Sequence, residues 1–306
     1  MSVIDTATDT VVATVPVGQA PIGVAVHPAG TYAYVTNRGD GSLSVIDART
    51  NTVSATIGVG GYGVAVHPDG RSVYLTGKGI SVLDTATNQV VRSIPYGPGL
   101  GSYDALAIVA TPDGRSLLTL LTSDNEGCFS TILGCRLRVF DIDISSGSAF
   151  YRDENEIDAF AKGIALNVAG TGLYVVNRTF LQDVGETDVV SGVSGAAFGF
   201  SIPLPDGGFG VAFHPSGQRL YATAGRDRGT EAGSVVVIDT VANRIINTVL
   251  VGVSPRSVAV NPAGTRVYVT NTGDDTVSVI DTASETVIDT IRGWPSVSSL
   301  VQSSQP

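Results

Sequence analysis

Residue types that carry catalytic or cofactor chemistry are scarce in this chain. Its 306 residues include only two cysteines, three histidines and two lysines, and charged residues make up 15%. A chain this rich in apolar and small residues is not expected to be disordered, because disorder goes with high charge and few apolar side chains. No uninterrupted apolar run approaches the ~20 residues that a membrane-spanning helix needs.

Positive charge is also sparse. The net charge is -10, and apart from Lys78 and Lys162 every basic residue is an arginine. An acidic chain without a basic patch is not expected to bind nucleic acid. The first residues, Met1 followed by Ser2–Asp5, lack the charged n-region and the apolar h-region of a secretory signal. The protein is therefore expected to be cytoplasmic if Met1 is the native start, or extracytoplasmic if the chain is a mature fragment.

The two cysteines, Cys128 and Cys135, lie in one irregular segment. A disulfide between them would suit an oxidising compartment, and two free thiols are the alternative. A structural zinc site is not expected, because no nearby histidines complete four ligands. The sequence also lacks a phosphate-binding loop and a calcium-binding loop, so no cofactor is predicted.

What the chain does contain is a repeat that runs from end to end. A P-x-G-V-A-V-H-P-x-G segment is followed by Y-V-T-N and then by S-V-I-D. The first segment appears as Gly23–Pro28, Gly63–Pro68, Gly210–Pro215 and Ser257–Pro262. Repetition at a fixed period indicates an array of structural units, so most of the repeated residues are expected to be structural.

Each unit shows the pattern of four short strands, A to D, in which Val, Ile, Thr and Tyr alternate between turn residues. The A–B spacing is constant at six residues, as from Pro28 to Tyr34, and the C–D spacing is usually six. The B–C spacing instead varies from 8 residues, Tyr74 to Val82, to 21 residues, Leu118 to Val139. The A–B and C–D connections are therefore predicted to be tight turns.

Four antiparallel strands in ~40–50 residues describe the blade of a beta-propeller. We predict one all-β domain over 1–306, with blades at approximately 22–57, 62–95, 105–152, 162–203, 209–250 and 256–291. A C–D pair at 2–15 and a segment resembling strand A at 296–302 would close the ring as an incomplete seventh blade. Six blades with an accessory hairpin are the alternative.

The Y-V-T-N tetrapeptides, Tyr34–Asn37 and Tyr268–Asn271, stand between H-P-x-G or its variant and S-V-I-D. This pattern resembles the YVTN family of beta-propeller repeats, which includes surface-layer and YncE-like proteins. The third unit departs from it with Leu117–Leu120, and the fourth has Asn167-Val168 in place of His-Pro. The resemblance implies seven blades and commonly an extracytoplasmic or cell-surface binding role, but a fold match implies no activity.

The repeated polar residues are predicted to stabilise turns. All three histidines, His27, His67 and His214, precede proline at the same repeat position and should bond to a neighbouring hairpin. They leave no histidine for a catalytic triad or a haem. The aspartate of S-V-I-D should form an Asx turn. Asn37, Asn177 and Asn271 should support the B–C turn.

The variable loops fall on one predicted face, since B–C and D–A connections share one end of each blade. Variable loops on a rigid scaffold are where function usually lies. The long B–C loops are predicted at Ser123–Arg136, Arg178–Thr187 and Arg226–Gly233, and the unusual D–A loops at Tyr96–Asp104 and Arg152–Phe160.

The residue before each strand A should line the channel mouth on that face, and these residues are Ile22, Tyr62, Leu106, Lys162, Phe209 and Arg256. Two cations beside aromatic rings would suit an anionic or carbonyl-bearing ligand with an apolar body. The predicted ligand-binding residues are Tyr62, Tyr103, Asp104, Lys162, Arg178, Phe209 and Arg256. Alternatively, Lys162 and Arg256 pair with acidic residues of the same loops, such as Asp104 or Glu154, and do not bind a ligand.

Two functions remain open at the level of sequence. The first is a non-catalytic binding or protein-interaction module for a small anionic ligand, a glycan or a protein. The alternative is a propeller enzyme of the lactonase, lyase or cyclase type. Lys162 would then act as electrophile or base, Tyr62 or Tyr103 as proton donor, and Arg256 would hold a carboxylate.

Overall fold

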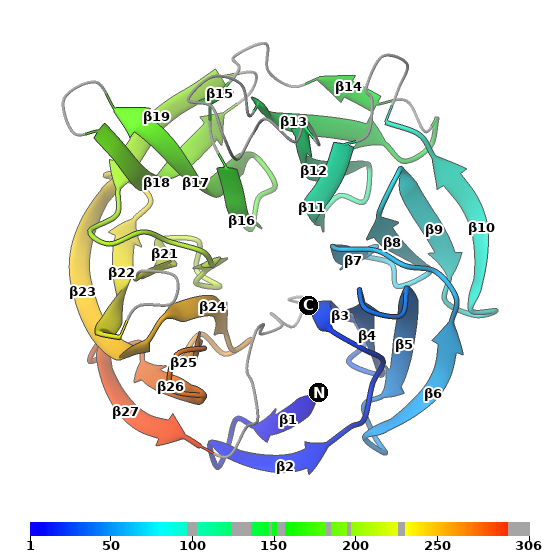
Figure 1. Ribbon diagram of the computed structural model, residues 1–306, viewed down its shortest axis with the longest axis horizontal. Helices are drawn as coiled ribbons and strands as arrows, with labels where there is room; N and C mark the ends of the chain where they lie inside the picture. The colour runs from blue at the N-terminus through cyan, green and yellow to red at the C-terminus, as the bar shows by residue number, and fades with distance from the viewer. Residues whose placement is uncertain are drawn as a thin grey trace. The chain divides into compact units, whose positions relative to one another are not determined.

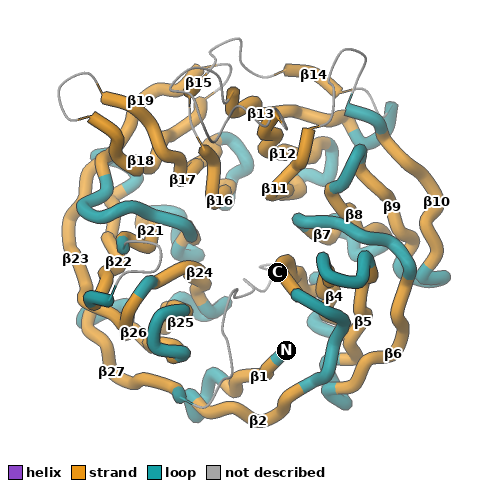
Figure 2. Tube along the Cα trace, in the orientation of Figure 1, coloured by secondary structure: helices purple, strands orange, loops and turns teal. Residues whose placement is uncertain are grey.

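The computed structural model describes residues 1–96, 103–123, 136–146, 149–151, 157–158, 160–181, 185–194, 197–225 and 230–292. All regular secondary structure in these ranges is β-strand (Figure 2). No helix in the described part of the chain is long and apolar enough to cross a membrane. The contacts divide the chain into two compact units, one formed mainly by Ala13–Ala161 and the other by Ser2–Val12 with Lys162–Gln302.

The first unit contains three sheets, each with its strands in sequence order (Figure 1). Blade 1 comprises β3 (Pro21–Val26), β4 (Tyr32–Asn37), β5 (Ser42–Asp47) and β6 (Thr52–Ile57). Blade 2 comprises β7 (Val64–Val66), β8 (Ser72–Thr76), β9 (Ile80–Asp84) and β10 (Gln89–Ile94). Blade 3 comprises β11 (Tyr103–Ala110), β12 (Ser116–Ser123), β13 (Arg136–Asp143) and β14 (Ala149–Tyr151), and β15 (Ile157–Asp158) also pairs with β13.

The second unit contains three four-stranded sheets in its blades. Blade 4 comprises β16 (Phe160–Leu166), β17 (Gly172–Leu181), β18 (Gly185–Ser194) and β19 (Ala197–Pro203). Blade 5 comprises β20 (Val211–Phe213), β21 (Arg219–Ala224), β22 (Ala232–Asp239) and β23 (Arg244–Val253). Blade 6 comprises β24 (Pro255–Val260), β25 (Arg266–Asn271), β26 (Thr276–Asp281) and β27 (Thr286–Ile291).

The strand prediction is confirmed in its main feature. All neighbouring strands of blades 1, 2, 3, 5 and 6 are antiparallel, and so are β17, β18 and β19 of blade 4, as the A to D pattern predicts. Two predicted loops contain strand. Arg178–Thr187 is largely strand, because β17 and β18 continue to pair as far as Leu181 and Gly185. The lengthened hairpin hydrogen-bonds backbone groups that a loop would leave to solvent. Within the predicted loop Arg152–Phe160, Ile157–Asp158 forms β15 and pairs with β13.

The apolar cores lie between neighbouring blades. Tyr34 and Val45 of blade 1 pack with Val73 and Leu75 of blade 2, and all four are buried. Corresponding clusters join blades 2 and 3, blades 4 and 5, and blades 5 and 6. Each sheet therefore buries its faces against the next sheet in the same unit, as expected of a repeat array.

The N-terminal strands, β1 (Ser2–Asp5) and β2 (Thr10–Thr14), form a separate two-stranded sheet. Ile4 packs against the cluster of Tyr268, Val277 and Ile291 in blade 6. The Tyr268 hydroxyl donates a hydrogen bond to Asp9 at 2.7 Å. The start of the chain thus docks on the last complete blade. The predicted closing strand at 296–302 lies outside the described residues, as do Cys128 and Cys135.

Candidate binding surface

The repeated histidines join neighbouring blades, as predicted. The Nε2 atoms of His27, His67 and His214 lie 3.0, 3.0 and 2.9 Å from carbonyl oxygens of the next blade, at Gly70, Gly114 and Gly264. His27 Nδ1 accepts a hydrogen bond from the Ala29 amide, so its Nε2 carries the proton and donates to Gly70. These side chains are part of the scaffold.

The repeated aspartates and asparagines are also structural. Asp281 Oδ1 accepts hydrogen bonds from the Ala283 and Ser284 amides, which is the predicted Asx turn. Asn37 Nδ2 donates to Ser42 and Ser44 at 3.0 Å, across the B–C turn of blade 1. Asn271 makes the equivalent pair of bonds in blade 6. The side chain of Asn177 lies outside the described residues.

The short acidic turns use their carboxylates internally. Asp40 accepts hydrogen bonds from the Ser42 hydroxyl at 2.7 Å and from the Gln19 amide at 2.8 Å. The Ser42 hydroxyl, with the Gln19 amide, holds the pKa of Asp40 below its usual range. In the described chain, no group of three or more His, Cys, Asp or Glu residues could hold a metal ion.

The candidate surface is built where the first strands of neighbouring blades begin. These strands contact one another within each unit, as β3 contacts β7 and β20 contacts β24. Glycine near the start of strand A allows the close approach. A methyl group on Gly210 would lie 2.7 Å from the Arg256 carbonyl oxygen, and one on Gly163 would clash with the Phe209 carbonyl oxygen. Backbone contact therefore orders Lys162, Phe209 and Arg256 on successive blades of the second unit.

Arg256 and Phe209 form the best-defined feature of this surface. The Arg256 guanidinium carbon lies 5.0 Å from the centroid of the Phe209 ring. Both side chains are partly exposed. Such a pair combines a cation with an apolar face, and both residues are among the predicted ligand-binding residues.

The first unit contains a similar pair that the sequence reasoning missed in part. The guanidinium of Arg38 lies 4.9 Å from the ring centroid of Tyr62. Tyr62 is a predicted site residue, but Arg38 is not. The sequence does contain a sign that Arg38 belongs with the predicted residues. Arg38 and Arg178 each directly follow the asparagine of a Y-V-x-N segment.

For the remaining predicted residues, the structure describes the position of the backbone but not of the side chain. Tyr103 and Asp104 begin β11 in the first unit and pair with Ser123 and Thr122. Lys162 lies in β16, and Arg178 pairs with Asp188 in the β17–β18 hairpin of the second unit. Their side chains are outside the described set. A single site that includes Tyr62, Tyr103 and Asp104 together with Lys162 and Arg256 stays a prediction.

Comparison with known proteins supports the fold. No family model matches the chain, and no curated protein matches it. The chain is similar to Kuenenia stuttgartiensis hydrazine synthase, with 23% identity and a TM-score of 0.74 over 92% of this chain and 89% of that chain. It is similar to the Myceliophteria thermophila Cps50 (Swd1) beta-propeller domain, with 11% identity and a TM-score of 0.70 over 95% of this chain and 91% of that one.

A third similar structure is the dihydro-heme d1 dehydrogenase NirN in complex with DHE. Identity is 16% and the TM-score is 0.64 over 96% of this chain, which spans only 61% of the NirN chain.

These similarities, together with the six antiparallel blades of four or five strands, show that the chain has a beta-propeller fold. Identities this low carry no information on activity, since unrelated functions share this fold.

Proposed function

We propose that this chain is a non-catalytic binding module. It is a YVTN-type repeat propeller, and its B–C and D–A connections form a binding site for an anionic ligand. The ligand is a small molecule with an anionic group and an apolar body. In the second unit, Arg256, Phe209 and Lys162 contact it. Arg178 contributes a further cation from the β17–β18 hairpin.

The observation that carries this proposal is the contact between Arg256 and Phe209. The guanidinium 5.0 Å above the ring leaves a partly exposed cation against a partly exposed apolar face. An anionic ligand can bond to the guanidinium while its apolar part packs on the ring. The histidines and the turn aspartates recur in the repeat and make scaffold bonds, whereas Arg256 and Phe209 are not repeated residues.

A fluorescence titration with the anionic aromatic dye anilinonaphthalene sulfonate tests the site. We expect Arg256→Glu and Lys162→Glu each to weaken dye binding about tenfold, the loss of one charge-assisted contact. Arg244→Glu is the matched control, because Arg244 is exposed on a C–D turn at the opposite end of blade 5. Equal weakening by all three variants, or none by the first two, would contradict the proposal.

A separate assay tests the alternative that the protein is an enzyme. Lactones and reactive carbonyl compounds incubated with the purified protein should remain unchanged if the site only binds. Turnover that is lost in Lys162→Ala would favour the enzyme and overturn the non-catalytic assignment.

A further inference from the structure

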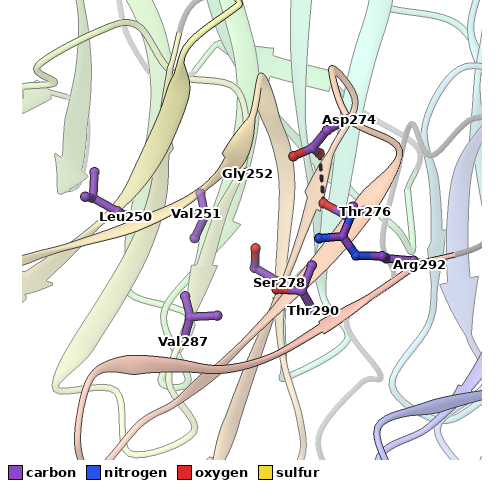
Figure 3. A pocket seen from close by; sticks show the side chains of 9 residues that line it. All are labelled: Leu250, Val251, Gly252, Asp274, Thr276, Ser278, Val287, Thr290 and Arg292. Atoms are coloured by element: carbon purple, nitrogen blue, oxygen red, sulfur yellow. Dashed lines mark hydrogen bonds between the residues drawn. The ribbon is translucent and has the colours of Figure 1, made fainter.

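A pocket of about 300 Å³ lies at the junction of blades 5 and 6. Neither Arg256 nor Phe209 is among the residues that line it. The end of β23 supplies Leu250 and Val251, and β27 supplies Val287 on the same apolar side. The opposite side is polar and includes Asp274, Thr276 and Arg292 (Figure 3). A volume near 300 Å³ is at the small end of ligand pockets and fits a molecule the size of an amino acid.

The polar side holds one positive and one negative group that are not paired with each other. Asp274 accepts one hydrogen bond at each oxygen, from the Thr276 hydroxyl at 2.8 Å and from the Val253 amide at 3.2 Å. Each oxygen retains capacity for a further donor. Arg292 reaches from the end of β27 toward Thr276, and no ion pair joins it to a carboxylate in the described part of the chain (Figure 3).

Blade 1 shows which of these features belong to the repeat. Asp40 makes the same turn bonds as Asp274, to Ser42 and to the Gln19 amide. The residue after strand D, however, is Gly58 in blade 1 and Arg292 in blade 6. The carboxylate is therefore a scaffold group in both blades, and the guanidinium is an addition specific to blade 6.

A buried hydroxyl adds a directed donor. Ser278 is 2% exposed and lines the pocket. Its oxygen accepts a hydrogen bond from Asn271 Nδ2 at 2.9 Å, so its own proton is free to point elsewhere. Among the described residues, none accepts that proton. Ser278 and Arg292 can thus donate to one anionic group, while Asp274 accepts from a cationic one.

We propose that this pocket binds a small zwitterion with an aliphatic side chain, of the class of the apolar α-amino acids. Arg292 and Ser278 bind its carboxylate, Asp274 accepts from its ammonium group, and Leu250, Val251 and Val287 cover its side chain. A purely anionic ligand would lie beside Asp274 and a purely cationic one beside Arg292, whereas a zwitterion satisfies both charges. The proposal is independent of the anionic ligand site of the preceding section.

A ligand-observed NMR titration with three matched probes tests the inference on the full chain. The probes are L-leucine, 4-methylpentanoate, which lacks only the amine, and isoamylamine, which lacks only the carboxylate. We expect L-leucine to bind with a Kd on the order of 1 mM. Each of the other two should bind about tenfold more weakly, through the loss of one charge-assisted contact.

Variants locate the binding. Arg292→Gln and Asp274→Asn should each weaken L-leucine binding about tenfold. Asp40→Asn is the matched control for Asp274→Asn, because it perturbs the same turn in blade 1 and should leave binding unchanged. Arg49→Gln controls for the loss of an exposed arginine. The proposal would be overturned if 4-methylpentanoate bound as tightly as L-leucine, if no probe bound, or if Asp40→Asn caused an equal loss.

Discussion

At the scale of single residues, the aspartate that ends strand C orders the C–D turn in blades 1, 2, 3, 5 and 6. Asp84 Oδ1 accepts hydrogen bonds from the Ala86 and Thr87 amides at 3.1 and 2.8 Å. The hydroxyl and amide of Thr87 hold the pKa of Asp84 below its usual range. In blade 3 the Ser145 hydroxyl, with the Ser146 amide and hydroxyl, lowers the pKa of Asp143 to about 2. The turns therefore depend on the ionised form of these side chains.

Acid should weaken the fold through these turns. Asp143 has a folded pKa of about 2, below its value of roughly 4 in an unfolded chain. The stabilisation is complete above about pH 4 and is lost as the pH falls toward 2. Urea unfolding midpoints at pH 7, 4, 3 and 2 should be nearly constant at first and then decline. In Asp143→Asn the decline should be smaller, and an identical decline in both proteins would count against this origin.

At the scale of the element, the residue that follows strand A decides whether its side chain bonds to the next blade. His27 satisfies its own turn through Nδ1 and reaches Gly70 of blade 2 through Nε2. Asn261 stands at the same place in blade 6, and its Oδ1 accepts from the Thr265 and Arg266 amides of its own turn. Asparagine thus preserves the turn, while histidine also provides the bond between blades.

Replacing His27 with Asn should separate these two roles. The turn bonds should survive, as they do at Asn261, and the bond to Gly70 should be lost. The free energy of unfolding should fall by about 1 kcal/mol, the usual net value of one hydrogen bond. Equilibrium urea unfolding measures this, and His27→Ala, which loses both sets of bonds, should be less stable still. If His27→Asn were as stable as the parent, the hydrogen bond between the blades would contribute nothing to the free energy of unfolding.

The strands and tight turns could be predicted because the repeat encodes them locally. The constant spacing from Pro28 to Tyr34 corresponds to a hairpin that is short in every blade. The Arg178–Thr187 loop was predicted wrongly because it departs from the repeat, although β17 and β18 simply extend their pairing through it. The Arg38–Tyr62 contact, and the pocket that both Leu250 and Arg292 line, bring together segments far apart in sequence, which spacing within a repeat cannot reveal.

At the scale of the whole molecule, the start of the chain contributes to the packing of the last blade. Ile4 contacts the buried cluster of Tyr268, Val277 and Ile291. Asp9 accepts a hydrogen bond from the Tyr268 hydroxyl and lies 3.9 Å from the Arg266 side chain. Burial, with the bond to Asp9, raises the pKa of Tyr268, so this hydroxyl remains a donor across the physiological range.

Removal of residues 1–15 should therefore loosen blade 6 first. The deletion exposes Tyr268, Val277 and Ile291 to water and removes the hydrogen bond to Asp9. The free energy of unfolding should fall by several kcal/mol, at ~25 cal/mol per Å² of exposed apolar surface. Amide hydrogen exchange should accelerate in β24–β27 more than in β7–β10, because opening spreads from the uncovered sheet through nearest neighbours. Tyr268→Phe, which removes only the hydrogen bond, should cause a smaller acceleration confined to blade 6. Unchanged exchange in β24–β27 after the deletion would show that the N-terminal hairpin adds no stability to this blade.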